Sequence, residues 1–152
     1  MGNHNPSAAD RLIFALDVGT EEEAKALVNE LKDTIRFFKV GLQLFIATGH
    51  SVVKWLVDQD LNVFLDLKIY DIGETVRRSV GEVSRLGVKF LTIHGEDQTV
   101  EAAREGKGDA ELEILFVPLL TSLGEGSLGE FKSVDDYVQQ RAEMAMKHGC
   151  DG

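Results

Sequence analysis

The sequence predicts an α/β fold of parallel strands and alternating helices, as part of a (β/α)8 barrel. Short apolar, β-rich runs alternate five times with longer helical patterns, an order typical of a parallel sheet with helical crossovers. Polar residues also gather late in each strand or directly after it. Polar groups at the carboxyl ends of parallel strands mark the functional edge of (β/α)8 barrels and of open α/β sheets.

The predicted strands cover residues 11–17, 36–40, 61–67, 88–94 and 112–120. Their apolar runs are nearly continuous, as expected for strands that are covered on both faces. The polar residues at or after their ends recur at intervals of 22 to 28 residues, which indicates a regular structural unit. They are Asp17, Lys39, Asp66 with Lys68, His94 and Thr121.

Helical patterns occupy the segments between these strands, at residues 20–34, 42–59, 75–87 and 97–108, and a last one covers 133–149. The first begins with the signature of a capping box, Thr20 followed by Glu23. The last begins at Ser133 with acidic residues in its first turn and ends at Gly149, as helices commonly do.

The length of the chain bounds the architecture. Five strand-helix units in 152 residues are three fewer than a closed barrel has, and such barrels typically need ~250 residues. The alternatives are a small open sheet and the N-terminal portion of a longer barrel, of which we favour the second. Residues 1–10 are then a disordered N-terminal extension, and 11–152 are part of a single barrel domain.

Composition narrows the classes of partner. Lys and Arg total 16 against 26 Asp and Glu, a net charge of -10. This charge opposes binding to nucleic acid or to an anionic membrane surface. No apolar run approaches the ~18 residues of a membrane span. One cysteine, Cys150, and an N-terminus without a secretion signal favour a cytoplasmic protein.

The stretch FLDLKIYDIGETV (64–76) carries charges where a buried strand would be apolar. Side chains two apart in a regular strand share a face, so Asp66 and Lys68 are expected to point the same way. Asp71 follows in the next loop. Because burying a charge costs several kcal/mol unless it is paired, this pattern favours a functional site. A solvated strand end with a stabilising ion pair is the alternative.

IFALDV, FFKVGLQLF, FLDLKIYDIGETV and VPLLTS occur in this order, and together they resemble the orotidine 5′-phosphate decarboxylase family. The resemblance extends from Arg11 to Gly152. It implies a homodimeric (β/α)8 barrel that converts orotidine monophosphate to UMP and CO2 in pyrimidine biosynthesis. It also implies a carboxy-lyase that needs no metal and no organic cofactor.

The resemblance implies a role for each charged residue at the strand ends. Asp17 and Lys39 would contact ribose hydroxyls, and Lys39 would also order the charges around it. Asp66 would lie beside the carboxylate of the substrate. Lys68 would protonate C6 as CO2 leaves. A fixed cation where negative charge develops is preorganised electrostatic stabilisation, which suits a carbanion without an electron sink.

The resemblance further implies that Asp71, Ile72 and Thr75 reach the site of a partner subunit, and that Thr121 lies over the pyrimidine. The family usually reads Ile-Pro-Asn-Thr after the second aspartate, whereas Gly73 and Glu74 occupy the two middle positions here.

The family's phosphate-binding Arg and Gln and its Gly-Arg turn would lie beyond position 152. The chain in isolation is therefore expected to hold the charged residues without the residues that bind the phosphate.

Two other readings stay open. Hexulose-phosphate synthase and ketogulonate-phosphate decarboxylase share the D-x-K-x-x-D pattern followed by a glycine, as at Gly73, but place a glutamate that binds magnesium where this chain has Lys39. The other reading is a catalytically incomplete barrel fragment that self-associates through exposed strand edges. His94 is interpreted as a hydrogen-bonded histidine at the barrel mouth.

Overall fold

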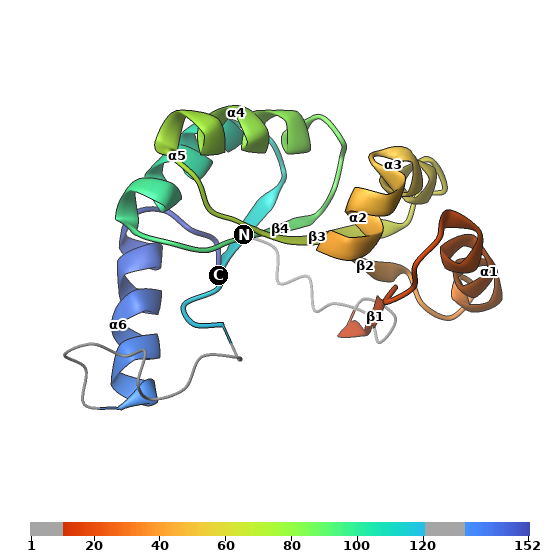
Figure 1. The fold of residues 1–152 in the computed structure, drawn as a ribbon, viewed down its shortest axis with the longest axis horizontal. Helices are drawn as coiled ribbons and strands as arrows, with labels where there is room; N and C mark the ends of the chain where they lie inside the picture. The colour runs from red at the N-terminus through yellow and green to blue at the C-terminus, as the bar shows by residue number, and fades with distance from the viewer. Residues whose placement is uncertain (1–10, 121–132) are drawn as a thin grey trace, which may run out of the picture. The chain divides into compact units, whose positions relative to one another are not determined.

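The structure is a computed structural model that describes residues 11–120 and 133–152. Its sheet has the strand order β1-β2-β3-β4-β5, and the pairs β1–β2, β2–β3 and β4–β5 are parallel. The predicted α/β fold of alternating strands and helices is confirmed. The elements are β1 (Ile13–Ala15), α1 (Glu21–Leu31), β2 (Phe37–Gly41), α2 (Leu42–Thr48), α3 (Ser51–Asp58), β3 (Asn62–Ile69), α4 (Gly73–Ser84), β4 (Phe90–Ile93), α5 (Asp97–Lys107), β5 (Glu113–Phe116) and α6 (Val134–Lys147), as Figure 1 shows.

The described chain divides into two compact units. The first contains the residues up to Asp66 together with Leu86–Lys89, and the second contains Leu67–Arg85 and Phe90–Gly152. The chain passes from one to the other within β3. The N-terminal extension expected at residues 1–10, Thr121 and the glycine-rich segment 124–130 lie outside the described residues.

The first unit is built on β1, β2 and the beginning of β3. Phe38 pairs with Phe14 on one side and with Val63 on the other. Phe38 and Val63 are fully buried, which explains the nearly continuous apolar runs of these strands.

Helix α1 begins as the sequence predicts. The Thr20 hydroxyl accepts a hydrogen bond from the Glu23 amide, and the Glu23 carboxylate accepts one from the Thr20 amide, both at 3.2 Å. The capping box is therefore confirmed.

The helical pattern at 42–59 forms two helices, α2 and α3, and the prediction of one continuous segment is wrong. Gly49 ends α2 with φ of 59°, a left-handed conformation that glycine adopts without a steric penalty. Its amide still donates to the Phe45 carbonyl at 2.7 Å, which closes the last turn. His50 then serves as the N-cap of α3.

The second unit packs α4 against α5 (Figure 1). The two helices approach closely at Gly106, where an added Cβ would lie 2.2 Å from the Arg77 carbonyl oxygen. Only glycine permits this approach of the two helices.

In residues 11–120 and 133–152, no helix is both long and apolar enough to cross a membrane.

Ser133 caps the start of helix α6, where its hydroxyl accepts from the Asp136 amide at 3.1 Å, and Gly149 follows the end of the helix with φ of 94°. Both predicted boundaries are confirmed. The following residues lie along β5: the Asp151 amide donates to the Ile114 carbonyl at 3.0 Å, and the Phe116 amide donates to the Gly152 carbonyl at 2.8 Å.

Candidate active site

In the first unit, Lys39 on β2 lies between two carboxylates. Its Nζ is 3.2 Å from Asp17 Oδ1 and 4.0 Å from Asp66 Oδ2. The side chains of Lys39 and Asp66 are only 23% and 17% exposed, whereas that of Asp17 is 76% exposed. The structure therefore brings together three residues that sequence analysis placed at three different strand ends. We call them the charge array.

Strand register explains how the charge array forms. Lys39 pairs with Ala15 on β1, and Gly41 pairs with Asp66 on β3. A Cβ added to Gly41 would lie 3.7 Å from Lys39 Nζ, an ordinary contact, so the ammonium lies beside Gly41 but does not require a glycine there.

Lys68, in the second unit, has an unusual backbone conformation. Its φ is 49°, and among the described residues only Asp60 is another non-glycine with positive φ. Aspartate tolerates the left-handed region better than most residues, whereas lysine has no such local compensation. The backbone of β3 therefore departs from regular strand geometry at Lys68, and the direction of the Lys68 side chain does not follow from counting residues.

Two hydrogen bonds to β4 hold this irregular end of β3. The Lys68 amide donates to Thr92 Oγ1 at 2.9 Å. The His94 amide donates to the Ile69 carbonyl at 3.1 Å. Thr92 is only 4% exposed and has apolar neighbours in β4, and sequence analysis did not identify it.

The loop after β3 carries the residues expected to reach a partner subunit. Ile72 is 73% exposed, and Asp71 and Thr75 are also exposed. Asp71 Oδ1 accepts from the Ile72 amide at 2.7 Å, which shapes the turn into α4. Tyr70, Asp71, Ile72 and Gly73 line a hollow of about 390 Å³ together with Glu96, Gln98 and Thr99.

Glu74 forms ion pairs with two arginines of its own helix, α4. Arg77 Nη2 and Arg78 Nε lie 2.9 and 2.6 Å from Glu74 Oε1. The hydrogen bond from Arg77, followed by that from Arg78, lowers the pKa of Glu74, so the carboxylate stays ionised and paired. A Cβ at Gly73 would make only an ordinary contact, 3.7 Å from Ala102, so this position does not need glycine for space.

His94 makes the kind of contact that sequence analysis expected. Its Nδ1 is 2.6 Å from the Val117 carbonyl oxygen. Because a carbonyl can only accept, Nδ1 is assigned the hydrogen. The ring also stacks on Phe116 of β5 at 6.5 Å and meets the ring of Tyr70, directly after β3, edge-on at 5.9 Å.

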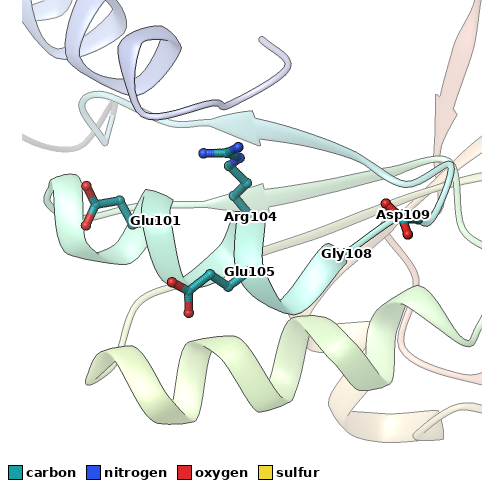
Figure 2. Close-up of a pocket in the computed structure, with 5 residues that line it drawn as sticks. All are labelled: Glu101, Arg104, Glu105, Gly108 and Asp109. Carbon is teal, nitrogen blue, oxygen red and sulfur yellow. The ribbon is translucent and has the colours of Figure 1, made fainter.

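A second hollow, of about 540 Å³, contains none of the predicted site residues. It is lined by Glu101, Arg104, Glu105, Gly108 and Asp109. Figure 2 shows that Glu101, Arg104 and Glu105 project from α5 in different directions. His148 Nδ1 lies 2.7 Å from Glu101 Oε1, so this acid already has a partner.

In the part of the chain that the structure describes, no group of three or more His, Cys, Asp or Glu side chains is arranged to hold a metal ion. The charge array contains two carboxylates, but its third member is an ammonium. Its chemistry is that of an ordered cation between acids.

Comparison with known proteins identifies the same family along nearly the whole chain. Residues 10–152 match a family model described as "Orotidine 5'-phosphate decarboxylase / HUMPS family". An orotidine 5′-phosphate decarboxylase of Rhodopseudomonas palustris (strain HaA2) is 43% identical over 155 residues. One of Methylococcus capsulatus is 46% identical over 156 residues. Each comparison covers 100% of this chain, which spans 66% and 64% of these two relatives, respectively.

A solved structure has the same fold. The crystal structure of orotidine 5′-phosphate decarboxylase from Lactobacillus acidophilus matches with a TM-score of 0.83 and 32% sequence identity. The match covers 93% of this chain and 69% of that one. The predicted kinship of the parallel sheet with (β/α)8 barrels is confirmed.

Proposed function

The chain belongs to the orotidine 5′-phosphate decarboxylase / HUMPS family, and on this premise we propose that the protein converts orotidine monophosphate to UMP and CO2. The observation that carries the proposal is the charge array, in which Lys39 is ion-paired with both Asp17 and Asp66. The relatives named above support the same reaction.

In the proposed reaction the bond between C6 and the carboxylate carbon breaks, and its electron pair stays on C6. Lys68 gives C6 a proton as CO2 leaves, so its ammonium acts as counter-ion and then as acid. Asp66 lies beside the substrate carboxylate. Its negative charge there favours departure of CO2.

The charge array supplies the remaining polar contacts. Asp17, the most exposed member, and Lys39 bind ribose hydroxyls. Lys39 also fixes Asp66, because a paired cation offsets the cost of burying a carboxylate. The protein uses no metal and no organic cofactor.

We infer that the protein is a cytoplasmic homodimer in which Asp71 and Thr75 reach the partner's site. The large exposed side chains of Tyr70 and Ile72 support an interface at this loop. One buried, free cysteine in the sequence is consistent with a reducing compartment.

A metal-dependent sugar-phosphate activity is the second candidate within the same family. Gly73, directly after the D-x-K-x-x-D pattern, is the feature in its favour. Lys39 opposes it, because the ammonium lies between the acids that would otherwise attract a divalent cation. The decarboxylation of orotidine monophosphate is therefore the function that this site supports best.

UMP formation from orotidine monophosphate by the purified protein tests the proposal. We expect turnover by the wild type and a loss of at least about 1,000-fold in Lys68→Ala, because both counter-ion and proton donor are removed. Lys54→Ala, at an exposed helical ion pair, is the matched control and should keep full activity.

Thermal unfolding of the three proteins checks that they are folded. Undiminished activity in folded Lys68→Ala would contradict the proposal. No turnover by the wild type, with turnover restored by addition of the C-terminal half of a relative, would instead identify the chain as an incomplete catalytic fragment.

A further inference from the structure

The end of β3 departs from regular strand geometry at Lys68. In a regular strand, the polar groups of consecutive residues face opposite neighbouring strands. Yet the Lys68 amide donates to Thr92 on β4, and the Ile69 carbonyl accepts from His94 at the end of the same strand. The φ of 49° at Lys68 accounts for this reversal. We call this irregularity the Lys68 kink.

Earlier residues of β3 follow the regular rule. The Asn62 amide donates to the Arg36 carbonyl, toward β2, and the Val63 carbonyl accepts from the Lys89 amide, toward β4. The backbone amides and carbonyls of even-numbered residues should thus point toward β2. Those of Lys68 would do so if the strand stayed regular. Its amide is instead turned toward β4.

A left-handed backbone at a lysine is sterically unfavourable, so surrounding interactions must maintain it. The Thr92 hydroxyl provides such an interaction, at 2.9 Å from the Lys68 amide. Thr92 is a polar side chain in a buried strand that runs Phe-Leu-Thr-Ile, where a valine would fill the same volume.

We propose that Thr92 is a positioning residue that maintains the Lys68 kink and thereby aims the Lys68 ammonium. The kinetic consequence rests on the proposed function, whereas the structural consequence does not. Without the hydroxyl, the Lys68 amide loses this acceptor, and the left-handed conformation loses an interaction that stabilises it. The backbone then relaxes toward the extended region and redirects the side chain.

Thr92→Val and Thr92→Ser form the decisive pair of variants. Valine has the shape of threonine but no acceptor, whereas serine keeps the hydroxyl and loses a methyl group. The first measurement is the ¹³Cα and ¹³Cβ chemical shifts of Lys68 in labelled protein, which report its backbone conformation. We expect the shifts to move to the extended range in Thr92→Val and to remain in place in Thr92→Ser.

The second measurement is steady-state kinetics of UMP formation. We expect kcat to fall about 10- to 100-fold in Thr92→Val with KM changed less than about threefold, since the reacting group is misplaced while binding contacts remain. Thr92→Ser should stay within about threefold of the wild type. A defect confined to folding would lower the amount of active protein and the melting temperature without producing this rescue by serine.

Unchanged Lys68 shifts in Thr92→Val, or equal losses of kcat in both variants, would overturn the proposal. If Thr92→Val does not fold, hydrogen exchange of the Lys68 amide decides: protection in the wild type and Thr92→Ser supports it, and rapid exchange overturns it. If the wild type makes no UMP even when the C-terminal half of a relative is added, the proposed function fails, but the shifts and the exchange still decide the role of Thr92.

Discussion

The charge array and the Lys68 kink use two different means of placing a charged side chain. Lys39 and Asp66 sit on paired strands, and Lys39 Nζ lies 4.0 Å from Asp66 Oδ2. Lys68 instead depends on a rare backbone conformation fixed by a hydroxyl on another strand. In the first region, ion pairs hold the charged side chains in place. In the second region, the conformation of the main chain determines where the charged side chain lies.

This difference predicts opposite sensitivities. The charge array should respond to loss of a charge and tolerate small changes of backbone. The region around the Lys68 kink should respond to changes of shape and backbone, even at residues without charge. Each of the following substitutions tests one side of this contrast, beginning with the largest expected effect.

Lys39→Met removes the cation of the charge array while keeping a side chain of similar length. Two carboxylates then remain without their shared partner, so we expect kcat/KM for UMP formation to fall about 100- to 1,000-fold. Lys54→Met, on the exposed face of α3, is the control. Activity of Lys39→Met within threefold of the control would show that the charge array is not part of the chemistry.

Gly95→Ala tests the dependence of the second region on backbone. Gly95 has φ of 116°, and a Cβ there would lie 2.4 Å from the Tyr70 ring and 2.8 Å from Thr99 Oγ1. We expect the free energy of unfolding to fall by about 2–4 kcal/mol.

Urea denaturation measures this change, with Gly81→Ala as the control. Gly81 lies in α4, where an added Cβ would approach no closer than 3.5 Å to the Gly106 carbonyl oxygen, so alanine should be neutral or stabilise by up to ~1 kcal/mol. Equal changes in the free energy of unfolding by the two substitutions would show that the region around the Lys68 kink is not especially sensitive to backbone changes.

Glu74→Asn tests whether a charge beside the second region takes part in the chemistry. Because Glu74 is paired with Arg77 and Arg78, we expect kcat/KM within about twofold of the wild type. A larger loss would show that the charge of Glu74 acts at the site.

The same variant should change the pH dependence of stability. The lowered pKa of Glu74 means that its contribution is fully present above the pKa of the unfolded chain and is lost as pH falls through that of the folded protein. Denaturation at about pH 7, 4.5 and 3.5 measures the difference in free energy of unfolding between the wild type and Glu74→Asn. This small difference should shrink in that order of pH. A difference that stays constant over this pH range would contradict the pairing of ionised Glu74 with Arg77 and Arg78.

Much of the fold follows from local patterns in the sequence. Capping at Thr20 and Ser133 depends on side chains within three residues, and both helix starts were predicted. The single helix expected at 42–59 was wrong because its apolar spacing continues across Gly49, whereas the backbone leaves the helical conformation there. A lone glycine within a helical pattern does not say which conformation it adopts.

The candidate site was predictable where residue type carried the signal. Charged residues at apolar strand ends revealed Asp17, Lys39 and Asp66, and the structure brings these three together. The contribution of Thr92 was not visible, because a threonine inside an apolar strand is an ordinary β-former. Its hydrogen bond depends on how β3 bends, and no sequence pattern records a left-handed lysine.

The Lys68 kink also bears on protein engineering. At a left-handed position, glycine or asparagine is favoured over lysine, so selection for heat resistance alone would tend to replace this residue. A library of variants screened by melting temperature would therefore enrich inactive proteins at position 68, whereas a screen for turnover would retain lysine. At this position, improvement of the fold and preservation of the chemistry require separate screens.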